Sequence, residues 1–538
     1  MHLIQKMRTG LASGSHFKLF PLFFLLILLC NIHLIYNPPH WDEIIGLHNQ
    51  ALFLAKHNFS FTELYAPGQH SYEGSNVYPY SILPILYAVW YSLFSPKTVH
   101  LLGHLLNFAC MAGTATLLTS VLRSRGVSAL CAAGWGIAFL LEPLTYGQTI
   151  ALGLEPALTF GVMLALWFAN RERWNCAMAA AFLAVFLKTS AAVLSFALFL
   201  YLLIRISASR SEWKKLRIPL AGFFLIFLFQ LFLLQHNVNM TAGGLHTASA
   251  DAAFSFPVYL LRKAWFHTGL YFPVLVPVFC AGIAFACARI RKNGWDSLLF
   301  FLAAAGYAGA YLIARTALPR YMAAAVPAIL LLPALNCRNR FVPWGLCVLF
   351  FLAPLCYRPL SFGERCSGEY LERNAEHVNQ TRANLELCRF LETEHFDSPV
   401  VAPWPIVQML TMPELGYVSK PLPNVYSGRV PFYAPVKKLV SLEAMPPDTL
   451  FVYQENDFEK YGMSNPSLRP PPENETLFRA RGIAGFTLVY KKIRRTGRSH
   501  LHPAGNKYSA PITGKPPRNT AYHTPACRCR ARTQLCRS

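Results

Sequence analysis

Residues 18–36 read KLFPLFFLLILLCNIHLIY, and the chain then continues through Asn37 to Trp41-Asp42-Glu43. Apart from Lys18, the run carries no charged residue, and its length approaches the roughly 20 apolar residues that cross a bilayer core. No small-residue cleavage site precedes Trp41, so the run is interpreted as a retained membrane anchor. Because carboxylates are costly inside hydrocarbon, the acidic pair is expected where the chain first leaves the lipid.

The composition extends this interpretation to the whole chain. Hydrophobic residues occupy 54% of the 538 positions and charged residues 14%, and long uncharged runs recur. This balance excludes an ordinary soluble protein and predicts a mainly α, polytopic membrane protein. The net charge of +23 does not indicate nucleic-acid binding, because about half of it comes from twelve Lys and Arg residues after position 490.

Membrane spans were assigned from run length, and loops from their Lys and Arg content. In this scheme the N-terminus and five basic clusters, from Arg123/Arg125 to Arg338/Arg340, face the cytoplasm. The loops 37–98 and 237–265 and everything after about residue 358 then lie on the outer face. The eleven predicted spans are approximately 18–36, 99–122, 126–143, 149–170, 174–188, 190–206, 217–236, 266–289, 295–314, 320–336 and 341–357.

Two stretches of the first outer loop have helical patterns without being full spans. Counting 77–95 as a span would invert every later loop, and Pro79 and Pro84 interrupt it, so it is predicted to be interfacial or re-entrant. The stretch 44–53 has helically spaced apolar residues with polar residues between them. That pattern predicts a helix lying along the membrane surface.

The sequence divides into a transmembrane domain (1–357), a small α/β domain (358–490) and a basic, disordered tail (491–538). In the second domain a helix is predicted over 381–392 and short strands over 399–402, 449–453 and 485–490. Cys366 and Cys388 can form a disulfide there if the compartment is oxidising.

Three acids and three bases fall at the outer boundary of this topology. Their arrangement suits a site in which cations hold a phosphate while a carboxylate takes a proton from a hydroxyl. No HExxH or comparable spacing indicates a metal site. The candidates are Asp42, Glu43, Glu155, Lys188, Arg315 and Arg320.

Each candidate also has a plainer explanation. Asp42 and Glu43 can be the solvated start of a surface helix, and Lys188 can extend to the interface without doing chemistry. Arg315 and Arg320 can pair with acids or lipid phosphates, and aromatic residues at span ends commonly form an interface belt. A carboxylate in a run as apolar as that of Glu155 needs a partner, which favours a functional role.

The order of these motifs resembles the GT-C membrane glycosyltransferases. The resemblance rests on the acidic pair after the first span, Leu154-Glu155-Pro156 in place of Leu-Asp-Pro, Lys188-Thr189-Ser190 where relatives have Thr-Lys-Gly, and Arg320-Tyr321 ahead of Val326-Pro327. It covers about residues 15–340. The pattern is similar to the protein O-mannosyltransferases and to the bacterial aminoarabinose and lipopolysaccharide-core transferases, which use polyprenyl-phosphate sugars.

The resemblance implies specific roles. Asp42 would be the base for inverting attack, Glu43 and Glu155 would orient the acceptor or a divalent cation (Mg²⁺ or Mn²⁺), and Lys188 with Arg320 would hold the lipid phosphate. Tyr78 stands where relatives carry Lys or His before a proline, so it offers the phosphate a hydrogen bond without charge.

The sequence therefore predicts an enzyme that transfers sugar from a polyprenyl phosphate to a lipid, glycan or protein, with no nucleic-acid partner. Its predicted place is the bacterial inner or plasma membrane, with the C-terminal domain extracytoplasmic. Two alternatives stay open. One is a transporter or flippase of lipid-linked saccharides with Glu155 and Lys188 as an ion relay, although no inverted repeat is visible. The other is an inactive homologue that acts as an assembly partner.

Overall fold

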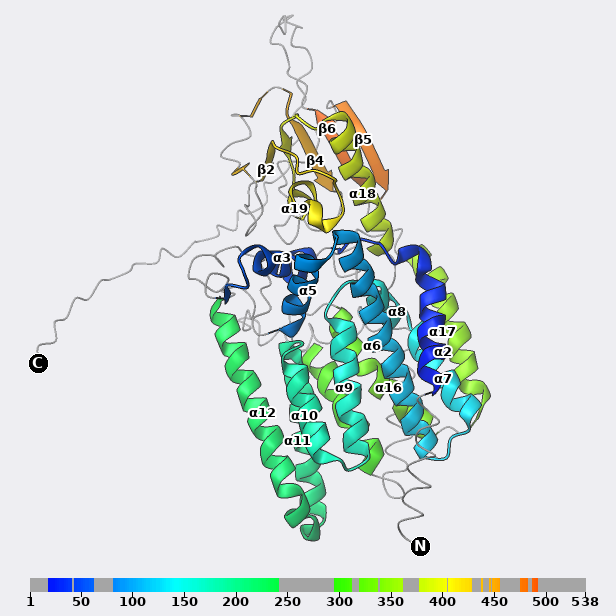
Figure 1. Ribbon diagram of the computed structural model, residues 1–538. Helices are drawn as coiled ribbons and strands as arrows, with labels where there is room; N and C mark the ends of the chain where they lie inside the picture. The colour runs from blue at the N-terminus through cyan, green and yellow to red at the C-terminus, as the bar shows by residue number, and fades with distance from the viewer. Residues whose placement is uncertain are drawn as a thin grey trace, which may run out of the picture. The chain divides into compact units, whose positions relative to one another are not determined.

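The computed structural model is dominated by helices, with one small mixed sheet formed by the C-terminal part of the chain (Figure 1). It describes residues 18–40, 43–61, 81–240, 295–311, 319–336, 339–360, 377–403, 405–427, 437–438, 445–446, 448–454, 475–481 and 486–491. The predicted fold class, mainly α with a small sheet, is confirmed in this outline. Asp42, Tyr78, Arg315, Cys366, the span 266–289 and the tail beyond Lys491 lie outside the described residues.

The long helices run side by side and share one apolar core (Figure 1). Small residues such as Ala112, Ala115, Ala181 and Ala184 are fully buried between them, which lets helix backbones approach closely. The helices are α2 (Leu19–Asn31), α6 (Pro96–Ser124), α7 (Ala129–Leu141), α8 (Pro143–Ile150), α9 (Glu155–Asn170), α10 (Trp174–Val185), α11 (Ala192–Ala208), α12 (Trp213–Met240), a helix over 295–311, α16 (Val326–Asn336) and α17 (Phe341–Leu360).

The predicted count of eleven spans is not confirmed. In the described part of the chain, three helical stretches are both long and apolar enough to cross a membrane: Pro96–Ser124, Thr189–Ala208 and Arg210–Leu233. Leu19–Leu34, Ile82–Leu93, Trp174–Val185, Arg320–Leu335 and Phe341–Leu352 are apolar but shorter. On α12, Leu225 and Phe232 point away from the bundle and are 63% and 55% exposed, as lipid-facing residues would be.

α7 and α8 could form a fourth span, but they meet at a bend of 64°. The cause is local, because Pro143 holds the preceding Glu142 in a non-helical conformation with ψ of 127°. The Glu142 carboxylate then caps α8, accepting hydrogen bonds from the backbone N–H groups of Leu144 (3.2 Å) and Thr145 (2.8 Å). Residues 144–148, which separate the predicted spans 126–143 and 149–170, are therefore helical, and Glu142 is the N-cap of α8.

The predicted surface stretch 44–53 is helical, as a π-helix η3 (Glu43–His48) followed by α3 (Asn49–Lys56). Its apolar positions Ile44, Leu47, Ala51 and Leu54 are buried as expected. Its polar residues His48, Asn49 and Gln50 are buried too, so no polar face is left for water. Packing on α5 (Ile82–Leu93) and on the sheet domain covers both sides of α3.

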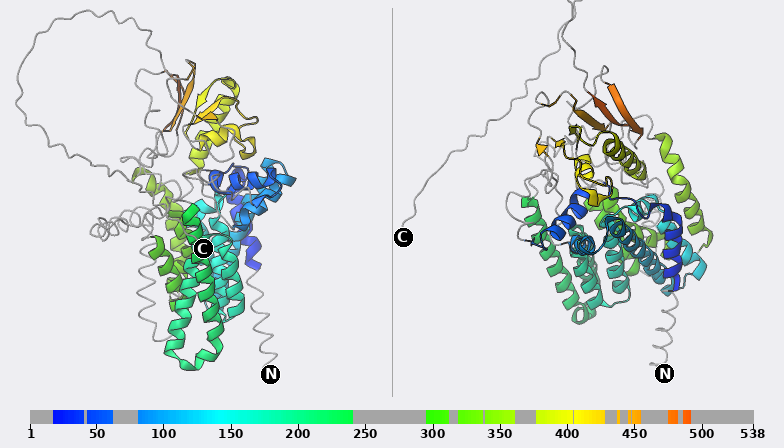
Figure 2. Two further views of the ribbon diagram at one scale, coloured as in Figure 1. Left: turned by 90° about the vertical axis from the view of Figure 1, so that its left-hand side faces the viewer. Right: turned by 45° about the horizontal axis from the view of Figure 1, so that its top comes forward.

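The sheet domain, defined as the described residues from His377 to Lys491, has strand order β3-β2-β1-β4-β6-β5. β1 to β4 pair in parallel, whereas β6 is antiparallel to both β4 and β5. Helix α18 (His377–Glu394) packs along β5 and β6, as Figure 2 shows, and its Cys388 is a buried free thiol. The strands are β1 (Val400–Val401), β2 (Val425–Ser427), β3 (Lys437–Lys438), β4 (Leu450–Gln454), β5 (Glu475–Arg481) and β6 (Phe486–Lys491), with a short helix α19 (Ile406–Thr411).

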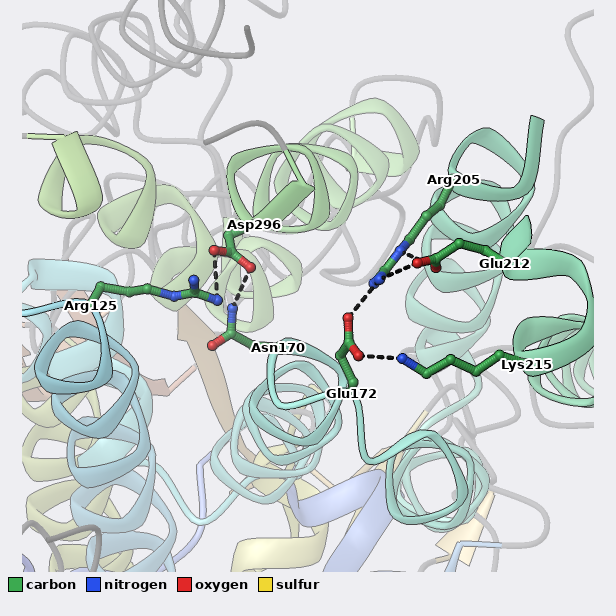
Figure 3. A network of polar contacts seen from close by, with 7 residues as sticks. All are labelled: Arg125, Asn170, Glu172, Arg205, Glu212, Lys215 and Asp296. Atoms are coloured by element: carbon green, nitrogen blue, oxygen red, sulfur yellow. Dashed lines mark hydrogen bonds and ion pairs between the residues drawn. The ribbon is translucent and has the colours of Figure 1, made fainter. Parts of the chain in front are cut away.

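Polar contacts join the helix ends at the far end of α9 from Glu155 (Figure 3). Arg205 on α11 pairs with Glu172 at 2.6 Å and with Glu212 at 2.7 Å, and Lys215 on α12 reaches Glu172 at 2.5 Å. Separately, Asp296 pairs with Arg125 (2.6 Å) and accepts a hydrogen bond from Asn170 (3.0 Å). These contacts fix six segments of the bundle at this end.

Candidate functional site

Glu155 opens α9, directly after the irregular segment 151–154. Pro156 occupies the first turn, where its fixed φ suits a helix start and its missing N–H is not needed. The amide of Asn107 on α6 donates to the carbonyl of Ala151 at 2.5 Å, which holds the segment in place. Glu155 is 4% exposed, so its carboxylate is presented from a buried helix N-terminus.

Two cations surround the Glu155 carboxylate. Lys188, in extended conformation between α10 and the 3-10 turn η4 (Thr189–Ala191), places Nζ 2.5 Å from Oε1. Arg320 on η8 (Pro319–Ala325) places Nε 3.3 Å from the same oxygen. All three side chains are at most 10% exposed, so the pairs act in a medium that screens charge poorly.

Tyr321 contributes an aromatic face to the same cluster. Its ring centroid lies 4.3 Å from Lys188 Nζ and 5.5 Å from the Arg320 guanidinium carbon. Both distances are within the range of cation–π attraction. The sequence interpretation of Tyr321 as an interface residue overlooked this contact, because only folding brings η8 to the turn after α10.

Glu43 lies on the other side of Gly153. A Cβ added to Gly153 would be 2.9 Å from Oε2 of Glu155 and 3.7 Å from Oε1 of Glu43, so the two carboxylates flank one backbone position. Glu43 Oε2 also accepts a hydrogen bond from the backbone N–H of His40 at 2.6 Å. The structure thus brings four of the seven predicted site residues together: Glu43, Glu155, Lys188 and Arg320.

Ser81 and Ile82, near the C-terminal end of the first outer loop, also contact this site. The sequence did not predict these contacts. The Ser81 hydroxyl donates to the carbonyl of Leu187 at 3.1 Å, and the backbone N–H of Ile82 donates to the carbonyl of Phe186 at 2.7 Å. Both bonds fix the turn that presents Lys188. Polar residues before an apolar run were the only available signal, and that signal is too common to be specific.

The divalent cation that the family resemblance implies stays a prediction, because Asp42, one of the three candidate carboxylates, lies outside the described residues. Among them, no group of three or more His, Cys, Asp or Glu side chains has the geometry of a metal site. One Glu155 oxygen is already paired with Lys188 and Arg320, and Glu43 accepts from a backbone N–H.

No known protein family description matches the chain, and no curated protein matches its sequence. Among solved structures, the chain is similar to ArnT from Cupriavidus metallidurans, an aminoarabinose transferase of the GT-C type. The ArnT structure bound to undecaprenyl phosphate shares 15% identity at a TM-score of 0.46, over 90% of this chain and 100% of that chain. The apo ArnT structure shares 16% identity at a TM-score of 0.45, over 87% of this chain and 97% of that chain.

Proposed function

We propose that this protein is a membrane glycosyltransferase that takes a sugar from a polyprenyl-phosphate donor. The observation that supports this most is the buried cluster in which Lys188 and Arg320 share one Glu155 oxygen. Two cations against one carboxylate form a set that a phosphate can join without adding an unpaired buried charge. Arg and Lys are also the usual side chains that hold phosphate oxygens.

The position of the cluster suits a donor carried by lipid. Glu155 opens an apolar helix, and Lys188 and Arg320 reach it from segments next to other apolar helices. A phosphate at this position would remain attached to a prenyl chain in the surrounding hydrocarbon. We place the site and the sheet domain at the extracytoplasmic face, in accord with the basic clusters assigned to the cytoplasm.

The proposed reaction needs a base and a stabilised leaving group. The acceptor hydroxyl oxygen forms a bond to the anomeric carbon while the bond from that carbon to the phosphate oxygen breaks, which inverts the configuration. The electron pair leaves with the lipid phosphate, whose added charge Lys188 and Arg320 stabilise. The hydroxyl proton goes to a carboxylate, for which we propose Asp42 by family resemblance, with Glu43 and Glu155 orienting the acceptor.

The acceptor is proposed only as a hydroxyl of a lipid, glycan or protein. Transport of lipid-linked saccharides is the competing function, because a buried Glu155–Lys188 pair can also serve as an ion relay. The two functions differ in one outcome, the formation of a glycosidic bond.

The test is sugar transfer by the purified protein in detergent. A panel of labelled polyprenyl-phosphate sugars would be offered with extracted lipids and membrane proteins as acceptors. We expect product from the wild type, and loss of product from Asp42→Asn and Glu155→Gln at unchanged helix content. Lys215→Met, which alters an exposed ion pair at the far end of the bundle, is the matched control and should retain activity.

Absence of product from wild type and variants alike, with all proteins folded, would reject the enzymatic proposal. Movement of labelled lipid-linked saccharide across vesicles without transfer would then favour the transporter. Product from Asp42→Asn equal to that of the wild type would remove Asp42 from the mechanism while leaving the reaction class intact.

A further inference from the structure

Five buried histidines meet beneath the sheet domain, in segments next to those that carry the Glu155 cluster. His48 on η3 lies 6.0 Å from His100 on α6 between ring centroids, and His40 lies 5.9 Å from His377 on α18. All are at most 6% exposed. We call them the histidine cluster: His40, His48, His100, His104 and His377.

The histidine cluster lies in the seam between the sheet domain and the segment 37–61 with α6. Tyr417 donates to the carbonyl of Pro39 at 2.9 Å, and Lys56 of α3 pairs with Glu414. Gly416 lies so close to His100 that an added Cβ would be 2.9 Å from its ring carbon. Ile44 and Leu52 also share the sheet domain's apolar core.

The hydrogen bonds in the seam favour neutral imidazole rings over protonated ones. His104 Nε2 lies 3.2 Å from the carbonyl of Asn37, and because a carbonyl only accepts, this nitrogen carries the proton. Nδ1 of His104 is buried without a hydrogen-bond partner among the described residues, and so is Nε2 of His100. A further proton on either ring would add both a charge and an unsatisfied N–H donor in a buried place.

Burial opposes protonation elsewhere in the cluster as well. Burial, followed by the neighbouring His377, lowers the pKa of His40 to about 3. Burial, with His100 and His104 beside it, holds the pKa of His48 well below its ordinary value. The other titratable and charged groups that face the cluster are Glu43 on η3, Lys56 on α3, Tyr87 and Tyr91 on α5, Cys388 on α18, Glu414 on η10 (Pro413–Leu415) and Tyr417.

We propose that the histidine cluster is a proton-sensitive latch, which holds the sheet domain on the segment 37–61 and α6 while its rings are neutral and releases it in acid. Opening exposes the rings to water, where they regain an ordinary pKa of about 6.5. Protons then bind the open state more readily than the docked state.

The direction of the effect follows from the lowered pKa values. A histidine whose pKa is lower in the docked state stabilises that state fully above about pH 6.5. This stabilisation is lost as the pH falls from about 6.5 towards the pKa of the docked state. Each histidine that behaves in this way raises the opening constant roughly tenfold per pH unit below about 6.5. Several histidines acting together would make the release depend steeply on pH.

The test is hydrogen–deuterium exchange on the full-length protein in nanodiscs, between about pH 7.5 and 5, corrected for the pH dependence of intrinsic exchange. We expect peptides covering 37–56 and 410–420 to lose protection below about pH 6.5, while α9 and α10 stay protected. Unchanged protection of the two seam segments down to pH 5 would overturn the proposal. So would simultaneous loss throughout α9 and α10, since that is global unfolding.

Variants separate the latch from other acid effects. His100→Gln combined with His104→Gln removes two titrating rings. The factor by which the opening constant rises per pH unit of acidification should then be about a hundred times smaller than in the wild type. His395→Gln, on a half-buried histidine of the sheet domain outside the cluster, should leave it unchanged. An unaltered slope in the double variant contradicts the proposal. If that variant does not fold, the wild-type protein alone tests the proposal. An opening constant that rises less than tenfold per pH unit in the wild type excludes a latch made of several histidines.

Discussion

Lys188 shares with Arg320 a largely buried position against Glu155 and Tyr321. Its ammonium group is held by the Glu155 carboxylate and the Tyr321 ring, so most of its freedom is lost before any substrate binds. Such preorganisation is what a site needs to stabilise charge that appears only in the transition state.

Replacing Lys188 with Met should therefore lower sugar transfer by at least about a hundredfold, whereas Lys188→Arg should retain part of the activity. The measurement is kcat/KM for the lipid-phosphate donor. Lys97→Met, on an exposed lysine near the start of α6, is the control. Equal rates for Lys188→Met and the wild type would show that this cation does not contact the leaving group.

Gly153 is important because it lacks a side chain. A Cβ at this position would approach Glu155 Oε2 to 2.9 Å, closer than ordinary packing allows, whereas Glu43 Oε1 at 3.7 Å would be in ordinary contact with it. The Glu155 carboxylate can therefore keep its position only beside a residue without a side chain.

Gly153→Ala should displace the Glu155 carboxylate and reduce transfer by about 10- to 100-fold, because small misplacements of catalytic groups are costly. Donor binding should change less, since Lys188 and Arg320 remain. Gly309→Ala adds a Cβ with nothing within 4 Å and is the matched control. A Gly153→Ala enzyme with full activity would remove the steric argument.

At the scale of elements, the bundle is tied at both ends of α9 by charge pairs, but the two ends differ in chemistry. At its start, two cations meet one carboxylate; at the other end, Arg205 is shared by Glu172 and Glu212 (Figure 3). The second arrangement leaves no surplus of positive charge around Arg205, which suits a structural role.

Arg205→Met should lower the free energy of unfolding by about 2 kcal/mol, because it leaves two carboxylates close together without their shared cation. Denaturant or thermal unfolding of the purified protein measures this change. Lys215→Met removes a half-exposed partner and should cost under about 1 kcal/mol. Activity per folded molecule should be unchanged in both, and a selective loss of activity in Arg205→Met would show coupling along α9.

At the scale of the whole molecule, the sheet domain and the segment 37–61 share one apolar core and one seam. Glu43 lies only three residues from His40, so the same segment carries a candidate site carboxylate and part of the histidine cluster. Any opening of the seam therefore frees a segment that reaches the site.

Tyr417→Phe tests the seam without changing its titrating imidazoles. Loss of the hydrogen bond to Pro39 should cost about 1 kcal/mol and raise opening roughly fivefold at every pH, with the same pH slope as the wild type. Hydrogen exchange of 37–56 measures it. Tyr426→Phe, on a half-buried strand residue, is the control, and a changed slope in Tyr417→Phe would contradict the assignment of the protons to histidine.

The local elements were largely predictable from the sequence. Hydrophobic run length located α6, α11 and α12, and periodicity located α18, β1, β4 and β6. Pro143 and Glu142 together carried the signal for the bent helix, yet run length alone made 126–143 appear to be one straight span. β2, β3 and β5 were missed, because short strands depend on pairing with neighbours rather than on their own pattern.

By itself the sequence determined the membrane class, the positions of the main helices and the candidates Glu43, Glu155, Lys188 and Arg320, because hydrophobic length and the cost of charge in lipid are properties of short segments. Only the tertiary structure decided that these four meet, that Gly153 separates two carboxylates, and that His48 is buried against His100. The segment 43–48 and residues 100, 155, 188 and 320 are far apart in the chain, and what brings them together is the packing of helices whose partners no local pattern identifies.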